Sequence, residues 1–112
     1  MKTELQNQLF EKYPKIFTQR FLPITESAMA FGIGCPDNWY NLIDTLCGQI
    51  QAYVDNQKSK VRKTIIPTRP FPQVEATQIK SKFGGLRFYY NGGDQYIKGL
   101  VSMAEAMSYK IT

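Results

Sequence analysis

Residues 74–90, VEATQIKSKFGGLRFYY, have the pattern of two β-strands joined by a tight turn. The turn is expected at Gly84–Gly85, because both positions of a glycine pair tolerate the positive φ of a hairpin turn. In the first strand, alternation places Val74, Ala76, Gln78 and Lys80 on one face and Glu75, Thr77, Ile79 and Ser81 on the other. In the second strand, Leu86, Phe88 and Tyr90 share the core face, and Arg87 and Tyr89 share the opposite one. We expect strands over 74–81 and 86–90.

Three helices are expected around this hairpin. The first covers residues 2–13, where Thr3 can serve as the cap, and ends at Pro14. The second begins near Pro36 and carries an apolar stripe at helical spacing. That stripe contains Trp39, Leu42, Ile43, Leu46, Cys47, Ile50, Tyr53 and Val54. The third is capped by Asp94, after a turn at Asn91-Gly92-Gly93, and its apolar stripe contains Ile97, Leu100, Val101, Ala104 and Met107.

Two segments lack a clear period. Residues 15–35 are expected to be irregular, with extended pieces near 16–22 and 29–33. Residues 56–73 are expected to form a connection with a short extended piece at 63–66, because Pro67, Pro70 and Pro72 exclude a helix and a central strand there. The fold class that follows is α+β: one domain over residues 1–112, with about three helices packed on one face of a short antiparallel sheet. The expected core includes Trp39, Leu42, Leu46, Ile50, Leu86, Phe88, Leu100 and Ala104.

The composition agrees with a packed domain outside membranes. The chain has 112 residues, of which 43% are apolar, so it can bury a core. No stretch approaches the ~18–20 apolar residues that cross a bilayer, and MKTELQNQLFEKY lacks the apolar run of a signal peptide. We therefore expect a cytoplasmic protein.

The positive charge is concentrated in the middle of the chain. Residues 56–90 carry eight basic side chains against Glu75 alone, whereas residues 1–55 carry four basic and six acidic ones. The eight are Lys58, Lys60, Arg62, Lys63, Arg69, Lys80, Lys82 and Arg87. If these eight side chains gather on one face, they would favour an acidic partner. If they are spread over loops and a sheet edge, they would only keep those segments soluble.

The residue types exclude several kinds of chemistry. The chain has no histidine, which removes Ser-His and Cys-His pairs and the HExxH metalloprotease arrangement. Cys35 and Cys47 are too few ligands for structural zinc, and Cys47 falls on the buried stripe of a helix, where a thiol acts as a small hydrophobe. A carboxylate pair or a lysine nucleophile stays open, although nothing marks one. We assign no catalytic residue, metal or cofactor.

Three interpretations compete for KFGGLRFYYNGG. It resembles a scrambled ribonucleoprotein signature, but the βαββαβ order of that RNA-binding domain is not visible. A phosphate-binding glycine loop at Gly92–Gly93 would place the carboxylate of Asp94 where the anion should lie, and GIGCP lacks a third glycine. The interpretation that we favour is structural, with glycines for turns and aromatics for the core.

The chain also resembles a group of small phage and prophage proteins of unassigned function. The resemblance is carried by LQNQLFEKYPKIFTQR, GCPDNWYNLIDTLC, VEATQIKSKFGGLRFYY and GLVSMAEAMS, and it covers roughly residues 5–108. Several members of that group continue into a paired-cysteine, zinc-knuckle-like tail, whereas this sequence ends in SYKIT. The resemblance implies a phage setting without a metal-dependent role, and it leaves the activity open.

The leading functional hypothesis is a non-enzymatic phage accessory protein that binds a host macromolecule in the host cytoplasm. Its partner would be a protein or ribonucleoprotein with an acidic surface, such as a CRISPR effector of host defence. The partner-binding residues would be the eight cations and Tyr89. The alternative is a protein that binds nucleic acid directly through the basic region 58–87. An enzyme that uses carboxylates or lysine is a third hypothesis.

Overall fold

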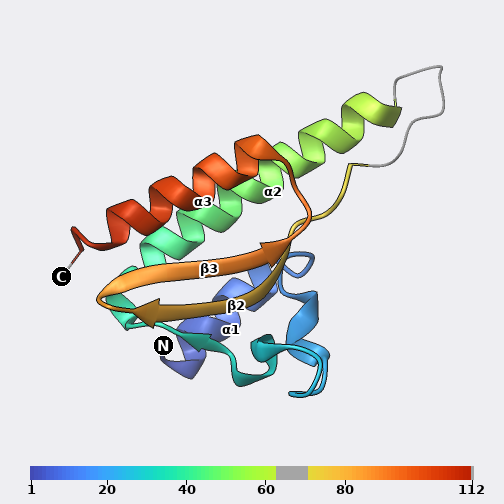
Figure 1. Cartoon of the computed structure of the whole chain (residues 1–112). Helices are drawn as coiled ribbons and strands as arrows, with labels where there is room; N and C mark the ends of the chain where they lie inside the picture. Colours follow the sequence, from blue (N-terminus) through green and yellow to red (C-terminus); the bar gives the residue numbers. More distant parts are fainter. Residues whose placement is uncertain (63–70, 112) are drawn as a thin grey trace.

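The computed structural model describes residues 1–62 and 71–111. This part of the chain forms an α+β fold of three α-helices and a three-stranded sheet in the order β1–β2–β3. Its elements are α1 (Thr3–Lys12), β1 (Ile33–Gly34), α2 (Tyr40–Arg62), β2 (Glu75–Lys82), β3 (Gly85–Asn91) and α3 (Gln95–Ser108). In Figure 1, α2 and α3 run side by side along the hairpin of β2 and β3, and α1 lies near β1 at the other edge of the sheet.

The sheet is mixed, so the prediction of an antiparallel sheet is right only for its main pair. β2 and β3 pair antiparallel, with Ile79 opposite Phe88. β1 then adds to the free edge of β2 in parallel, with Ile33 opposite Ile79. A strand of two residues is too short to show a period in the sequence, which is why this part of the sheet was missed.

The hairpin turn lies one residue earlier than predicted. β2 ends at Lys82 and β3 begins at Gly85, so the turn consists of Phe83 and Gly84, with φ of 54° and 79°. Gly85 is instead buried, and a Cβ on it would overlap the ring of Tyr109. Because Gly85 allows this close approach, the second glycine of the pair serves packing and the first serves the turn.

A β-bulge in β2 changes which side chains reach the core. The register shifts between Ala76, which faces Tyr90, and Gln78, which faces Tyr89. Ala76 and Ile79 are therefore both buried, whereas strict alternation had placed them on opposite faces. The extra residue of the bulge, Thr77, and the next one, Gln78, both reach the outer face.

The predicted helices exist, with corrected ends. Lys2, not Thr3, is the N-cap residue of α1 and gives no side-chain cap; its N–H donates to Asp37 instead. α2 follows a 3-10 turn, η3 (Asp37–Trp39), and continues to Arg62, so residues 56–62 are helix and not connection. No proline or glycine interrupts that extension, and its residue types have ordinary helix propensity. The cap of α3 is confirmed, since the Asp94 carboxylate accepts from the N–H groups of Tyr96 and Ile97.

The segment between α1 and β1 turns more than expected. Instead of extended pieces near 16–22 and 29–33, it contains two 3-10 helices, η1 (Thr18–Phe21) and η2 (Ala28–Phe31), before the short β1. The Ser27 hydroxyl caps η2 by accepting from the N–H of Met29. The extended piece predicted at 63–66 lies outside the described residues.

The core lies between the helices and one face of the sheet. Every predicted core residue is buried except Leu100, which is partly buried, and Cys47 is buried as predicted. α1 is tied to α2 where the Asp44 carboxylate accepts from the Tyr13 hydroxyl at 2.6 Å and from Lys12 at 2.9 Å. Burial raises the pKa of Asp44, and the two donors outweigh this, so the pKa is lowered overall. No helix in the described part of the chain is long and apolar enough to span a bilayer.

Candidate functional site

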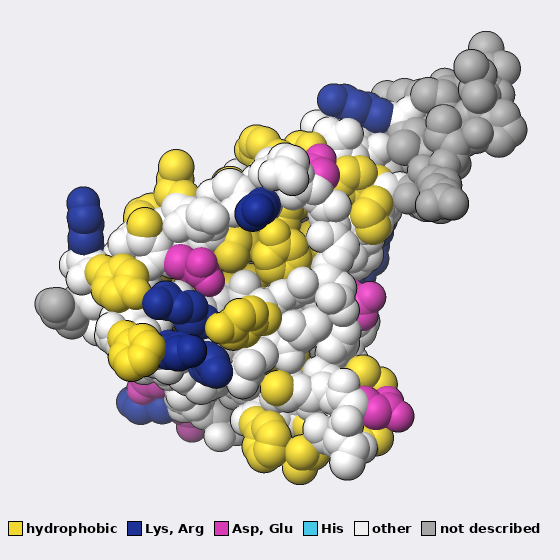
Figure 2. Space-filling view, in the orientation of Figure 1, with side chains coloured by type: hydrophobic (Ala, Val, Ile, Leu, Met, Phe, Trp, Pro, Cys, Tyr) yellow, Lys and Arg dark blue, Asp and Glu magenta, His cyan; other side chains and the backbone are white. Residues whose placement is uncertain are grey.

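The outer face of the hairpin carries three cations near the turn: Lys80, Lys82 and Arg87. Lys80 lies directly opposite Arg87 in the register, and Lys82 lies opposite Gly85 at the turn. Figure 2 shows a group of Lys and Arg side chains over the turn end of the hairpin, with hydrophobic side chains and an acidic one beside it.

Each of these cations lies near an exposed aromatic ring. The Lys80 Nζ is 5.8 Å from the ring centre of Tyr89, and the Lys82 Nζ is 5.6 Å from that of Phe83. The Arg87 guanidinium is 5.9 Å from the ring centre of Tyr109 and donates to its hydroxyl at 3.0 Å. Tyr89 is 43% exposed, Phe83 is 87% exposed and Tyr109 is 51% exposed. We call these six residues the hairpin surface: Lys80, Lys82, Phe83, Arg87, Tyr89 and Tyr109.

The positive charge of the hairpin surface is largely uncompensated. Within the described residues, the ion pairs are Lys2–Asp37 and Lys12–Asp44, both away from this surface. The pKa of Arg87 is raised, first by its hydrogen bond to Tyr109 and to a smaller extent by the negative charge of the nearby Glu105. The Glu105 carboxylate itself accepts a hydrogen bond from the N–H of Phe88. Like charges directly opposite each other weaken a strand pair. The Lys80–Arg87 pair therefore does not contribute to the stability of the hairpin through charge.

Backbone strain coincides with the same surface. Phe83 adopts a φ of 54°, which is unfavourable for a bulky side chain, and it presents its ring almost fully to solvent. Glycine or asparagine would occupy this turn position at lower cost. A strained position that exposes a large aromatic ring is typical of a binding site.

The other predicted site residues lie elsewhere or outside the description. Lys58 and Lys60 are on the last turns of α2, and the Lys58 ammonium donates to Gln73, which precedes β2. β2 has eight residues, so this end is about 25 Å from the turn end of the hairpin. Arg62 ends α2, and its side chain is not described; Lys63 and Arg69 lie outside the described residues. The structure thus brings together Lys80, Lys82, Arg87 and Tyr89, and it separates Lys58 and Lys60 from them.

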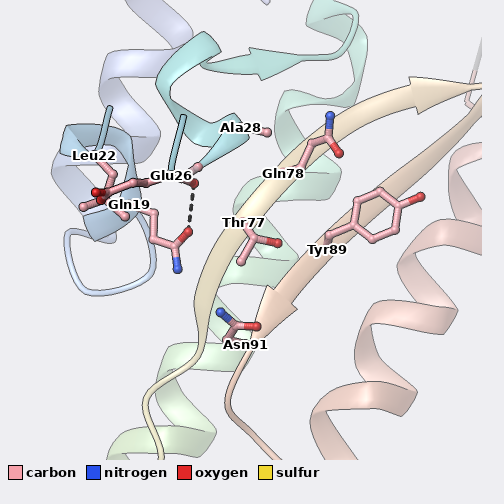
Figure 3. Close-up of a pocket in the computed structure, with 9 residues that line it drawn as sticks. Gln19, Leu22, Glu26, Ala28, Thr77, Gln78, Tyr89 and Asn91 are labelled. Atoms are coloured by element: carbon pink, nitrogen blue, oxygen red, sulfur yellow. Dashed lines mark hydrogen bonds between the residues drawn. The ribbon is translucent and has the colours of Figure 1, made fainter. Parts of the chain in front are cut away.

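A polar cleft adjoins the hairpin surface at Tyr89. It has a volume of about 490 Å³ and is lined by Gln19, Leu22, Glu26, Ser27, Ala28, Thr77, Gln78, Tyr89 and Asn91. Figure 3 shows Thr77 and Gln78 between the η1–η2 segment on one side and the Tyr89 ring on the other. We call this the β2 cleft. Its wall from η1–η2 was not predictable, because η1 and η2 lie 44 to 57 positions before the start of β2 in the sequence.

The described residues show little sign of nucleophilic or metal chemistry. Cys35 and Cys47 are buried free thiols, and burial raises the pKa of Cys35 to about 12 and raises that of Cys47 as well. Thiols of this kind are poorly reactive at neutral pH. No three His, Cys, Asp or Glu side chains of the described ranges cluster in a way that could hold a metal ion.

Sequence reasoning named four of the six hairpin-surface residues and missed Phe83 and Tyr109. Phe83 lay between the predicted strand 74–81 and the predicted Gly84–Gly85 turn and was given no role, and Tyr109 reaches the hairpin only through the packing of α3. Comparison with protein-family models, curated proteins and solved structures found no match to this chain. The functional argument is therefore made from the site itself.

Proposed function

We propose that this protein is a non-catalytic binding protein that holds a nucleic-acid strand on its hairpin surface. The observation that carries the proposal is the pairing of three cations, none in an ion pair among the described residues, with three exposed aromatic rings. Proteins that bind single strands combine two components: cations that contact the phosphates, and aromatic rings on which the bases stack. An acidic protein would contact the same cations and rings, and the capture experiment below distinguishes the two kinds of partner.

The proposal predicts a binding constant that depends on salt and on specific cations. A fluorescent single-stranded DNA should bind at low salt, and affinity should fall with a log–log slope near 2, because each of about three phosphate contacts contributes ~0.7. The double variant Lys80→Glu/Arg87→Glu should bind about 10- to 100-fold more weakly, as measured by fluorescence anisotropy. Its fold should be retained, because the double substitution exchanges one like-charged pair on the outer face for another, so the cross-strand repulsion stays about the same.

The matched control is Lys58→Glu/Lys60→Glu, which changes the net charge by the same amount at the far end of α2. It should retain most of the affinity. Equal loss in the two double variants would show that binding follows net charge and not the hairpin surface. Absence of binding by the unaltered protein at low salt would refute the proposal.

A phage accessory role against host defence is the second candidate. The resemblance to phage proteins motivates it, and one structural observation favours a protein partner: Phe21 and Phe31 are 76% and 74% exposed on the η1–η2 segment. Such an inhibitor, for example of a CRISPR effector in the host cytoplasm, would bury these rings at the interface.

This second candidate predicts specific capture of a host protein. A tagged chain should retain the partner from nuclease-treated bacterial lysate at micromolar concentration, and Phe21→Ser/Phe31→Ser should lose it, as detected by mass spectrometry. Recovery of nucleic acid alone before nuclease treatment, with no protein afterwards, would support the first proposal and remove the second.

A further inference from the structure

We propose that the β2 cleft receives an unpaired nucleobase from the strand bound by the hairpin surface. This inference rests on the nucleic-acid binding proposed above and adds the form of the ligand. It follows from the chemistry of the cleft, its position and its shape.

The cleft lining suits a base and not a phosphate. It contains neutral amides and hydroxyls, the apolar side chains of Leu22 and Ala28 and one carboxylate, Glu26, and no Lys or Arg is among its lining residues. A phosphate would be repelled by Glu26, whereas the edge of a base presents both donors and acceptors to amide groups. The Ser27 hydroxyl donates to the Gln19 Oε1 at 2.8 Å, which leaves the Gln19 amide hydrogens for a ligand. The side chains of Gln78 and Asn91 also line the cleft and carry amide donors and acceptors.

The position of the cleft allows one nucleotide to use both sites. The outward-facing pair Gln78–Tyr89 lies two residues along each strand from the pair Lys80–Arg87, which is a distance of about 7 Å. Tyr89 belongs to both sites, since its ring lies near Lys80 on one side and lines the cleft on the other. A base that stacks on Tyr89 would therefore hold its own backbone against the cations.

The cleft is open to solvent and large enough for one base. Its volume of about 490 Å³ falls in the ~300–1,000 Å³ range of small-molecule sites. Side chains from three segments, η1–η2, β2 and β3, line it, and a base that is paired and stacked in a duplex is not free to contact them. The bulge that turns both Thr77 and Gln78 outward supplies the polar floor.

The test compares two labelled DNA strands of equal charge and about 12 nucleotides, one with bases and one abasic throughout its centre. The unaltered protein should bind the strand with bases about tenfold more tightly. Tyr89→Ala should bring this ratio close to one. Tyr96→Ala, which removes a similarly exposed tyrosine from the first turn of α3, should keep the ratio near ten.

The outcomes separate this inference from the proposal on which it rests. Equal, salt-dependent binding of both strands by the unaltered protein would overturn the base site and leave nucleic-acid binding intact. A ratio that Tyr89→Ala does not change would also overturn the base site. Binding of neither strand at low salt would overturn both proposals.

Discussion

Replacing Phe88 by alanine is expected to lower the free energy of unfolding by about 3–5 kcal/mol. Phe88 is 2% exposed, faces Ile79 across the hairpin and lies 6.1 Å, centre to centre, from the ring of Tyr90. Its removal leaves a cavity where the sheet packs against α3. Since a domain of this size has a stability of about 5–15 kcal/mol, the melting temperature should fall by roughly 10–20 °C.

Tyr89→Ala is the matched control for this experiment. Tyr89 is the next residue in β3, but it points to the outer face and is 43% exposed. Its replacement should cost about 1 kcal/mol or less. Urea denaturation of the two variants would compare the faces directly, and similar losses of stability would show that the inner and outer faces of β3 are assigned incorrectly.

Gly92→Ala is expected to destabilise the fold by about 3 kcal/mol or more, for two additive reasons. Gly92 has a φ of 84°, which disfavours any residue with a Cβ. That Cβ would also overlap the backbone carbonyl oxygen of Gln73, the residue that leads into β2. Neither backbone segment can move aside easily, because both continue directly into the β2–β3 pair.

Gly84→Ala separates these two causes. Gly84 has almost the same φ, 79°, but its Cβ would meet nothing within 4 Å. This variant should therefore lose only the conformational part, about 1 kcal/mol. If equilibrium unfolding gives the two variants equal stabilities, the close approach between Gly92 and Gln73 contributes nothing, and the expected difference is wrong.

The sequence predicted the elements whose evidence is local and periodic. The apolar stripe of α2, the Asp94 cap of α3 and the inward set of β3 were all found where expected. In each case the signal lies within one element and has a strong physical cause, either burial of one face or a satisfied helix terminus. The α+β class followed from these elements.

The errors arose where a distant contact competes with a local preference. The glycine pair alone does not tell which residues form the turn, and the ring of Tyr109, which comes from the end of α3, occupies the space beside Gly85. The one-residue shift that results places Lys80 opposite Arg87. The candidate site therefore depends on a contact between residues 24 positions apart.

By itself, the amino-acid order determined that this chain builds helices on a hairpin, that one face of β3 is apolar, and that its cations lie mainly in the middle third. Only the tertiary structure decided which cations share a surface, where β2 bulges, and how η1–η2 closes the β2 cleft. The reason is that side-chain periodicity specifies a face within one element. The register of a strand pair and the approach of η1–η2 to β2, which lie far apart in the sequence, are set by packing between elements.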